Sequence, residues 1–131
     1  MKKSNTELNA LFKRILDICF TIHTQYGPGM LESFYESVIC HEFSKAAISH
    51  QRQVPVHVIH DGAEVGLGYR MDILVEEEIV LELKSKSYLV EADHKQIITH
   101  LKTANKRLGL LVNFGEAHLK NGIHRKVNGF R

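Results

Sequence analysis

Two carboxylates and a lysine stand close together in the segment GYRMDILVEEEIVLELKSK, residues 68–86. Alternating apolar residues on both sides of its three consecutive glutamates predict two strands joined by a turn. A hairpin centred on Glu77 would place Asp72 directly opposite Glu82, with Lys84 further along the same face. Because like charges in facing positions destabilise a sheet, this acidic pair needs a chemical explanation.

Two explanations for the pair follow from its chemistry. On a solvated face, Asp72 and Glu82 would be ordinary surface carboxylates, neutralised by Lys84 and Arg70. On a sheet covered by helices on both sides, buried like charges would need a cation. A hard divalent ion, Mg²⁺ or Mn²⁺, prefers carboxylate oxygens, and Lys84 beside it would stabilise charge developing on a phosphate.

The remaining segments predict an α/β or α+β sandwich, with a mixed sheet and helices on both faces. The letters SNTE predict a capping box with Ser4 as N-cap, for a helix that ends at Gly27. Further helices are expected at about 31–46 and 92–105, and strands at 53–59, on both sides of the glutamates, at 108–114 and at 121–127. Pro55 places the first strand at a sheet edge, since proline has no N–H to donate.

Periodicity also assigns apolar side chains to the core. Among them are Leu31 in the second helix and, on a single face of the hairpin, Tyr69, Met71, Ile73 and Val75. The opposite face of the hairpin is left with the acidic pair and the lysine.

Length and composition favour one soluble globular domain over residues 1–131. The chain is 44% hydrophobic and 24% charged, and no apolar run approaches membrane-spanning length. Cys19 and Cys40 are expected to be buried and unpaired, as in a reducing compartment, so we expect a cytoplasmic protein. The net charge of +2 argues only weakly for any partner.

Four segments together resemble a known family. The segments GMLESFY, GYRMDILVEEEIVLELK, HKQIITHLK and LGLLVNFGE occur in the order and spacing of GxxExxY-type proteins, a branch of the PD-(D/E)XK nuclease superfamily. The resemblance runs from His23 to Val127. It implies a restriction-endonuclease-like core, with a mixed, mostly four-stranded sheet flanked by helices on both faces.

The resemblance also implies roles for individual residues. Asp72 and Glu82 would be metal ligands, Glu32 an additional acidic ligand, Lys84 the catalytic lysine and Gln96 a site-orienting residue. The chain departs from the pattern Gln-x-x-x-Tyr of related nucleases, because His100 occupies the tyrosine position. From the sequence, His94 and His100 are expected at the surface or at the edge of the site.

The expected function is that of a metal-dependent nuclease acting on DNA, with RNA also open, and with Mg²⁺ or Mn²⁺ as cofactor. The segment from Lys84 to Arg107 is rich in lysine, and Lys86, Lys95 and Lys102 are expected to contact nucleic-acid phosphates. Two alternatives stay open on the same fold: a catalytically inactive nucleic-acid-binding module, and a protein-interaction subunit. A homodimer or a larger complex is open as well.

Overall fold

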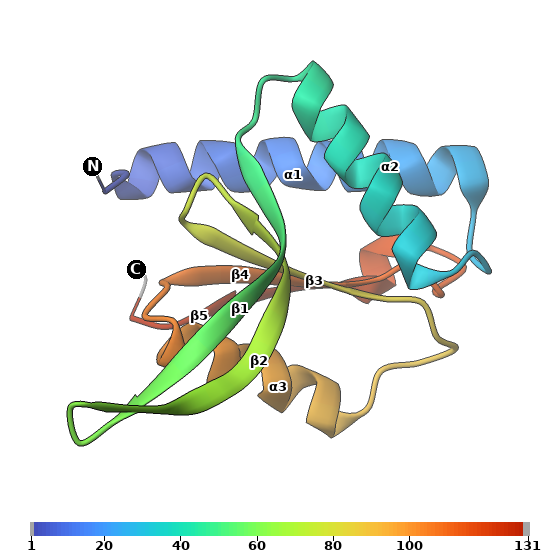
Figure 1. Ribbon diagram of the computed structural model, residues 1–131. Helices are drawn as coiled ribbons and strands as arrows, with labels where there is room; N and C mark the ends of the chain where they lie inside the picture. The colour runs from blue at the N-terminus through green and yellow to red at the C-terminus, as the bar shows by residue number, and fades with distance from the viewer. Residues whose placement is uncertain (1, 130–131) are drawn as a thin grey trace.

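The computed structural model describes residues 2–129, and Leu67 only in its backbone. Three helices and five strands follow one another as α1 (Asn5–Tyr26), α2 (Glu32–Lys45), β1 (His50–His60), β2 (Ala63–Val75), β3 (Ile79–Lys84), α3 (Glu91–Thr103), β4 (Leu108–Asn113) and β5 (Ile123–Val127), with a short 3₁₀ turn, η1 (Leu119–Gly122), before β5 (Figure 1). The strands form one sheet in the order β1-β2-β3-β4-β5. Only β3 and β4 are parallel.

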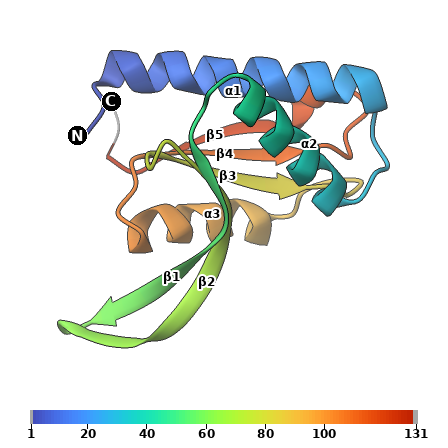
Figure 2. The same ribbon diagram turned by 45° about the horizontal axis from the view of Figure 1, so that its top comes forward.

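Helices cover both faces of this sheet. Helices α1 and α2 lie on one face and α3 lies on the other (Figure 2). The parallel pair requires a crossover connection, which α3 provides, and every residue of β4 is buried. The mixed sheet with two helical layers is as predicted and agrees with a restriction-endonuclease-like fold. It has five strands rather than mostly four, because β5 adds an antiparallel neighbour to β4.

The first helix begins as its sequence predicts. The Ser4 hydroxyl accepts a hydrogen bond from the Glu7 N–H at 3.1 Å, and the Glu7 carboxylate accepts one from the Ser4 N–H at 2.9 Å. The helix ends at Gly27, whose φ of 67° is a conformation that favours glycine. The second helix differs from expectation at one position. Leu31 is 76% exposed, because it is the N-cap residue with an extended backbone and lies outside the helical face that packs on the sheet.

The hairpin of β2 and β3 has the predicted register near its turn. Val75 pairs with Ile79 and Ile73 pairs with Leu81, so the strands are symmetric about Glu77. Positive φ angles at both central turn residues are the geometry of a type I′ turn. This geometry normally favours asparagine or glycine, but two glutamates adopt it here.

The prediction of a single apolar face along β2 is wrong at two positions. Ile73 and Val75 face α1 and α2, whereas Tyr69 and Met71 belong to the cluster beneath α3. Register shifts in the β1–β2 pair, after Val56 and after Val58, increase the local twist. The ribbon of these two strands curls away from the plane of the sheet, as Figures 1 and 2 show.

Strand β1 forms an edge of the sheet, as Pro55 predicts. Cys19 and Cys40 are both buried and free of disulfide bonds. Over residues 2–129, no helix has the length and apolar character needed to cross a membrane.

Candidate active site

The acidic pair lies where β2 and β3 stop pairing. The last backbone pair of the ladder is Ile73 with Leu81, and continuing this register by one step would bring Asp72 opposite Glu82. Instead, the Asp72 Oδ2 atom accepts a hydrogen bond from the Leu83 N–H at 2.8 Å. A side-chain carboxylate thus replaces a backbone carbonyl as the partner of β3, which holds Asp72 beside Glu82.

Both carboxyl groups are held in conditions that favour a proton. Burial, and then the charge of Glu82, raises the pKa of Asp72 to about 7. Burial likewise raises the pKa of Glu82 to about 7, because its side chain is almost inaccessible, and a hydrogen bond with Asp72 opposes this shift. Glu82 is buried and Asp72 is partly buried. Two such adjacent carboxyl groups, which cannot both ionise without cost, share a proton or bind a cation.

Lys84 follows at the end of β3 and is held by α3. Its Nζ atom donates to Gln96 Oε1 at 3.4 Å and lies 3.8 Å from Asp93 Oδ1. Lys86 donates to the other oxygen of Asp93 at 2.8 Å. The structure therefore brings Lys84 and Gln96 together, as the sequence-based roles require, and adds Asp93 as the anion that holds both lysines.

Asp93 was not among the residues singled out in the sequence. It is the third residue of α3 and accepts a hydrogen bond from the Val90 N–H at 2.9 Å. Burial would raise the pKa of Asp93, but the hydrogen bond from Lys86 and that from Val90 outweigh burial and lower the pKa. The sequence does carry a signal that could have identified Asp93: it lies three residues after the N-cap of the helix that follows Lys84 and Lys86.

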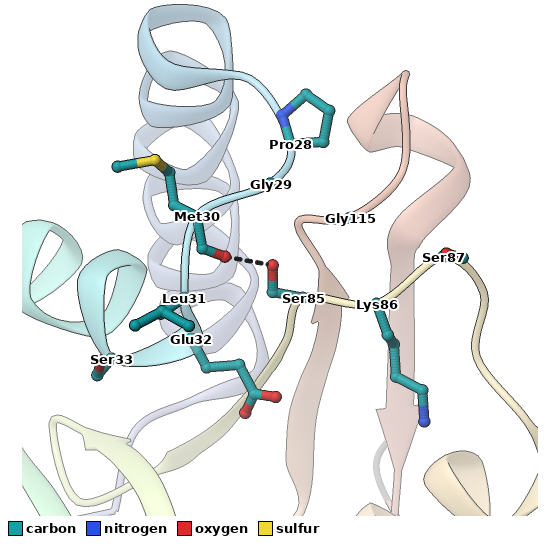
Figure 3. A pocket seen from close by; sticks show the side chains of 10 residues that line it. All are labelled: Pro28, Gly29, Met30, Leu31, Glu32, Ser33, Ser85, Lys86, Ser87 and Gly115. Atoms are coloured by element: carbon teal, nitrogen blue, oxygen red, sulfur yellow. Dashed lines mark hydrogen bonds between the residues drawn. The ribbon is translucent and has the colours of Figure 1, made fainter.

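Glu32 reaches the site from the first turn of α2. A cleft of about 400 Å³ is lined by Glu32 and Asp72, and a larger hollow of about 670 Å³ is lined by Glu32 and Lys86. In the close view of the larger hollow, the side chains of Glu32 and Lys86 extend in the same direction from its two sides (Figure 3). Burial raises the pKa of Glu32, and the charge of Lys84 opposes the shift. Of the two, only the smaller cleft is lined by a member of the acidic pair.

The segment Gly29-x-x-Glu32-x-x-Tyr35 has a structural explanation for two of its three named residues. Gly29 has a φ of 106°, which side-chain-bearing residues rarely adopt. The Tyr35 hydroxyl donates to the Gly27 carbonyl at 2.6 Å and accepts from the Met30 N–H at 3.2 Å. Tyr35 thereby anchors the loop that leads into α2, and the loop sets the position of Glu32.

His100 is buried, so of its two expected places the surface is wrong, and it lies beside the site against Glu82. The residue is 4% exposed because its ring lies between Glu82 and Tyr69. The Nδ1 atom of His100 is 3.0 Å from Glu82 Oε1. Burial lowers the pKa of His100, and the charge of Asp72 opposes this shift.

A second acidic residue of α2, Glu36, was also missed. It is buried and accepts hydrogen bonds from Arg52 Nε at 3.0 Å and from Gln53 Nε2 at 2.7 Å. Gln53 lies in the cleft with Asp72 and has a φ of 49°. Glu36 therefore fixes β1 against α2 at the wall of the site.

A comparison with protein families identifies the superfamily of the chain. The family model described as the PD-(D/E)XK nuclease superfamily matches residues 9–126, which include the acidic pair and the lysine. The chain belongs to the PD-(D/E)XK nuclease superfamily. Neither the curated proteins nor the solved structures contain a match.

PD-(D/E)XK nucleases generally use divalent metal ions, and the chemistry of the acidic pair fits such an ion. Burial is the main cause of the raised pKa values of Asp72 and Glu82, and a bound cation would favour the charged forms of both groups. Their carboxylate oxygens are hard ligands suited to Mg²⁺ or Mn²⁺. Within residues 2–129, no three His, Cys, Asp or Glu side chains are gathered as a set able to hold a metal ion. The pair fits two ligand positions, and Glu32 is not gathered with it as a third.

The three further lysines expected at a PD-(D/E)XK substrate surface differ in their surroundings. Lys86 is held by Asp93 beside the site. Lys95 and Lys102 lie on the exposed side of α3, along a shallow groove, and Lys95 pairs with Glu91 at 3.3 Å. All three come from the β3–α3 segment, which also carries Lys84 and Gln96.

Proposed function

We propose that this protein is a metal-dependent nuclease of the GxxExxY-type branch, which hydrolyses phosphodiester bonds in DNA, with RNA as the second substrate to be tested. The observation that carries the proposal is the partly buried contact of Asp72 with Glu82. The Lys84 amine, at the end of the same strand as Glu82, is supported by Gln96. The loop geometry of Gly29 and Tyr35 supports the assignment to the branch.

In this proposal, Asp72 and Glu82 would hold Mg²⁺ or Mn²⁺, and Glu32 would add negative charge to the same cleft from α2 without contacting the ion directly. The bound ion would lower the pKa of a water molecule and neutralise charge on the phosphate. Lys84 would donate to a non-bridging phosphate oxygen, where its charge offsets the negative charge that develops during attack. Gln96 would orient the Lys84 amine, while Lys86, Lys95 and Lys102 would contact flanking phosphates.

The direct test uses purified protein with labelled single- and double-stranded DNA and RNA, in Mg²⁺, Mn²⁺ or EDTA. We expect cleavage with either metal, none in EDTA, and a loss of at least about 100-fold for Asp72→Asn, Glu82→Gln and Lys84→Ala. Asp17→Asn on the exposed face of α1 is the matched control and should cleave at the wild-type rate. Cleavage by all three site variants at the wild-type rate would overturn the proposal.

The same experiment separates the two alternatives. Nucleic-acid binding without metal-dependent cleavage would assign an inactive binding module. A protein that binds no nucleic acid at low salt would be assigned to protein interaction.

A further inference from the structure

Each carboxyl group of the acidic pair has a hydrogen-bonding partner on a neighbouring residue. Asp72 uses Oδ2 to accept the hydrogen bond from the Leu83 N–H, and Glu82 uses Oε1 in its 3.0 Å contact with His100 Nδ1. Glu82 also receives a hydrogen bond from the Asp72 backbone. The remaining hydrogen-bonding positions of the two groups are left to each other or to a cation. The orientation of the Glu82 carboxyl group therefore depends in part on the His100 ring.

The ring of His100 is itself held in place from β2. It stacks on Tyr69 with 3.7 Å between ring centroids and an angle of 6° between their planes. The Tyr69 hydroxyl donates to the His100 carbonyl at 2.7 Å and lies 2.8 Å from the Thr103 hydroxyl. Tyr69 thus holds both the backbone and the side chain of His100.

We propose that His100 is a positioning residue: it donates its Nδ1–H to Glu82 and so orients that carboxylate toward Asp72, while Tyr69 keeps the imidazole plane in place. The inference rests on the metal site proposed above, because the role inferred for His100 is to orient a carboxylate that binds the metal. Partners that hydrogen-bond to metal ligands orient them, and their loss weakens metal binding about 10- to 100-fold.

The hydrogen bond has two possible directions, and only one fits this role. A neutral imidazole with its proton on Nδ1 donates to a Glu82 carboxylate, which keeps its negative charge for a cation. With the proton on Nε2 instead, His100 Nδ1 would accept a hydrogen from a protonated Glu82, and that carboxyl group would be a poor metal ligand. Which ring nitrogen of His100 carries the proton therefore decides between the two directions of the hydrogen bond, and this can be measured.

The first test measures the ring ¹⁵N chemical shifts of His100 in the wild-type protein at about pH 8, in EDTA. We expect the Nδ1–H tautomer in the wild type and the Nε2–H tautomer in Glu82→Leu, where the acceptor is gone. A wild-type ring protonated on Nε2 alone would overturn the inference. This measurement needs no metal and no cleavage, so its outcome is distinct from failure of the proposed nuclease function.

The second test measures Mn²⁺ affinity by calorimetry for two substitutions of His100. His100→Asn keeps a donor near the Nδ1 position and should bind within about threefold of wild type, whereas His100→Phe keeps the ring but should weaken binding about 10- to 100-fold. His94→Phe is the matched control on the same helix and should leave the affinity unchanged. Wild-type affinity in a folded His100→Phe, or equal losses in both His100 variants, would overturn the inference. Should His100→Phe fail to fold, Tyr69→Leu replaces it, with a weakened affinity expected.

Discussion

Asp72 and Leu83 are joined by a 2.8 Å hydrogen bond from the backbone N–H of Leu83 to the carboxylate, at the point where β2 and β3 cease to pair. The bond satisfies a donor that the diverging strands would otherwise leave unpaired. It also fixes Asp72 in contact with Glu82, so the end of the ladder and the acidic pair are one structural feature. The predictions below depend on the charge of this pair, on the lysines beside it, and on the loop that presents Glu32.

Metal binding should stabilise the protein through Asp72. At a hundredfold excess over its dissociation constant, Mn²⁺ should add about 2.7 kcal/mol to the free energy of unfolding, which is roughly 10 °C in Tm for a chain of this size. Asp72→Asn should lose most of this gain. Without metal at about pH 8 it should melt above wild type, because repulsion is removed while the amide oxygen still accepts from Leu83. Thermal melts with Mn²⁺ or EDTA check both expectations; equal Mn²⁺ responses would contradict a metal site.

Stability without metal should fall as the pH rises toward 8. The pKa values of Asp72 and Glu82 are about 7 in the folded protein, against ordinary values of 3.8 and 4.5. Between about pH 4.5 and 7 the native pair thus binds more protons than the unfolded chain, and its contribution to stability is lost as pH passes 7. Urea unfolding in EDTA from about pH 5 to 8 should show a shallower decline for Asp72→Asn than for wild type. Parallel curves would show that burial does not raise these pKa values.

The exposed lysines of α3 should govern the salt dependence of DNA binding. Removing one phosphate contact should reduce the slope of log affinity against log salt by about 0.9 for duplex DNA. We expect this change for Lys95→Ala and for Lys102→Ala, measured in EDTA between about 50 and 200 mM salt. Lys13→Ala is a close control for Lys95, since Lys13 also pairs with an acidic residue one helical turn away, Asp17. An unchanged slope in both α3 variants would remove this helix from the interface.

Loss of the Tyr35 hydroxyl should destabilise the loop before α2. Tyr35→Phe keeps the ring stacked on Phe114 but removes the partners of the Gly27 carbonyl and the Met30 N–H. We expect a loss of about 1–3 kcal/mol in the free energy of unfolding. Tyr26→Phe, at a half-exposed ring, should cost less than about 0.5 kcal/mol. Urea denaturation of both variants makes the comparison, and equal stabilities would show that the loop does not depend on this hydroxyl.

The sequence alone determined those structural features that depend on residues close together in the chain. The capping box of α1 follows from the spacing of Ser4 and Glu7. The register of the β2–β3 hairpin near its turn follows from apolar alternation around that turn. Continued by one step, this register predicts that Asp72 lies near Glu82, and the hydrogen bond from the Leu83 N–H to Asp72 keeps it there. Local periodicity and short-range hydrogen bonds carry this information directly.

The tertiary structure alone decided which distant residues surround the acidic pair. Glu32 comes from α2, and Asp93 and His100 come from α3 across the opposite face of the sheet. The twist of β2 carries Tyr69 to the α3 side, where it stacks on His100, although its place in the alternation predicted the opposite face. These contacts depend on strand twist and on how α3 crosses the sheet after the parallel connection, and such long-range packing leaves no periodic signal in the chain.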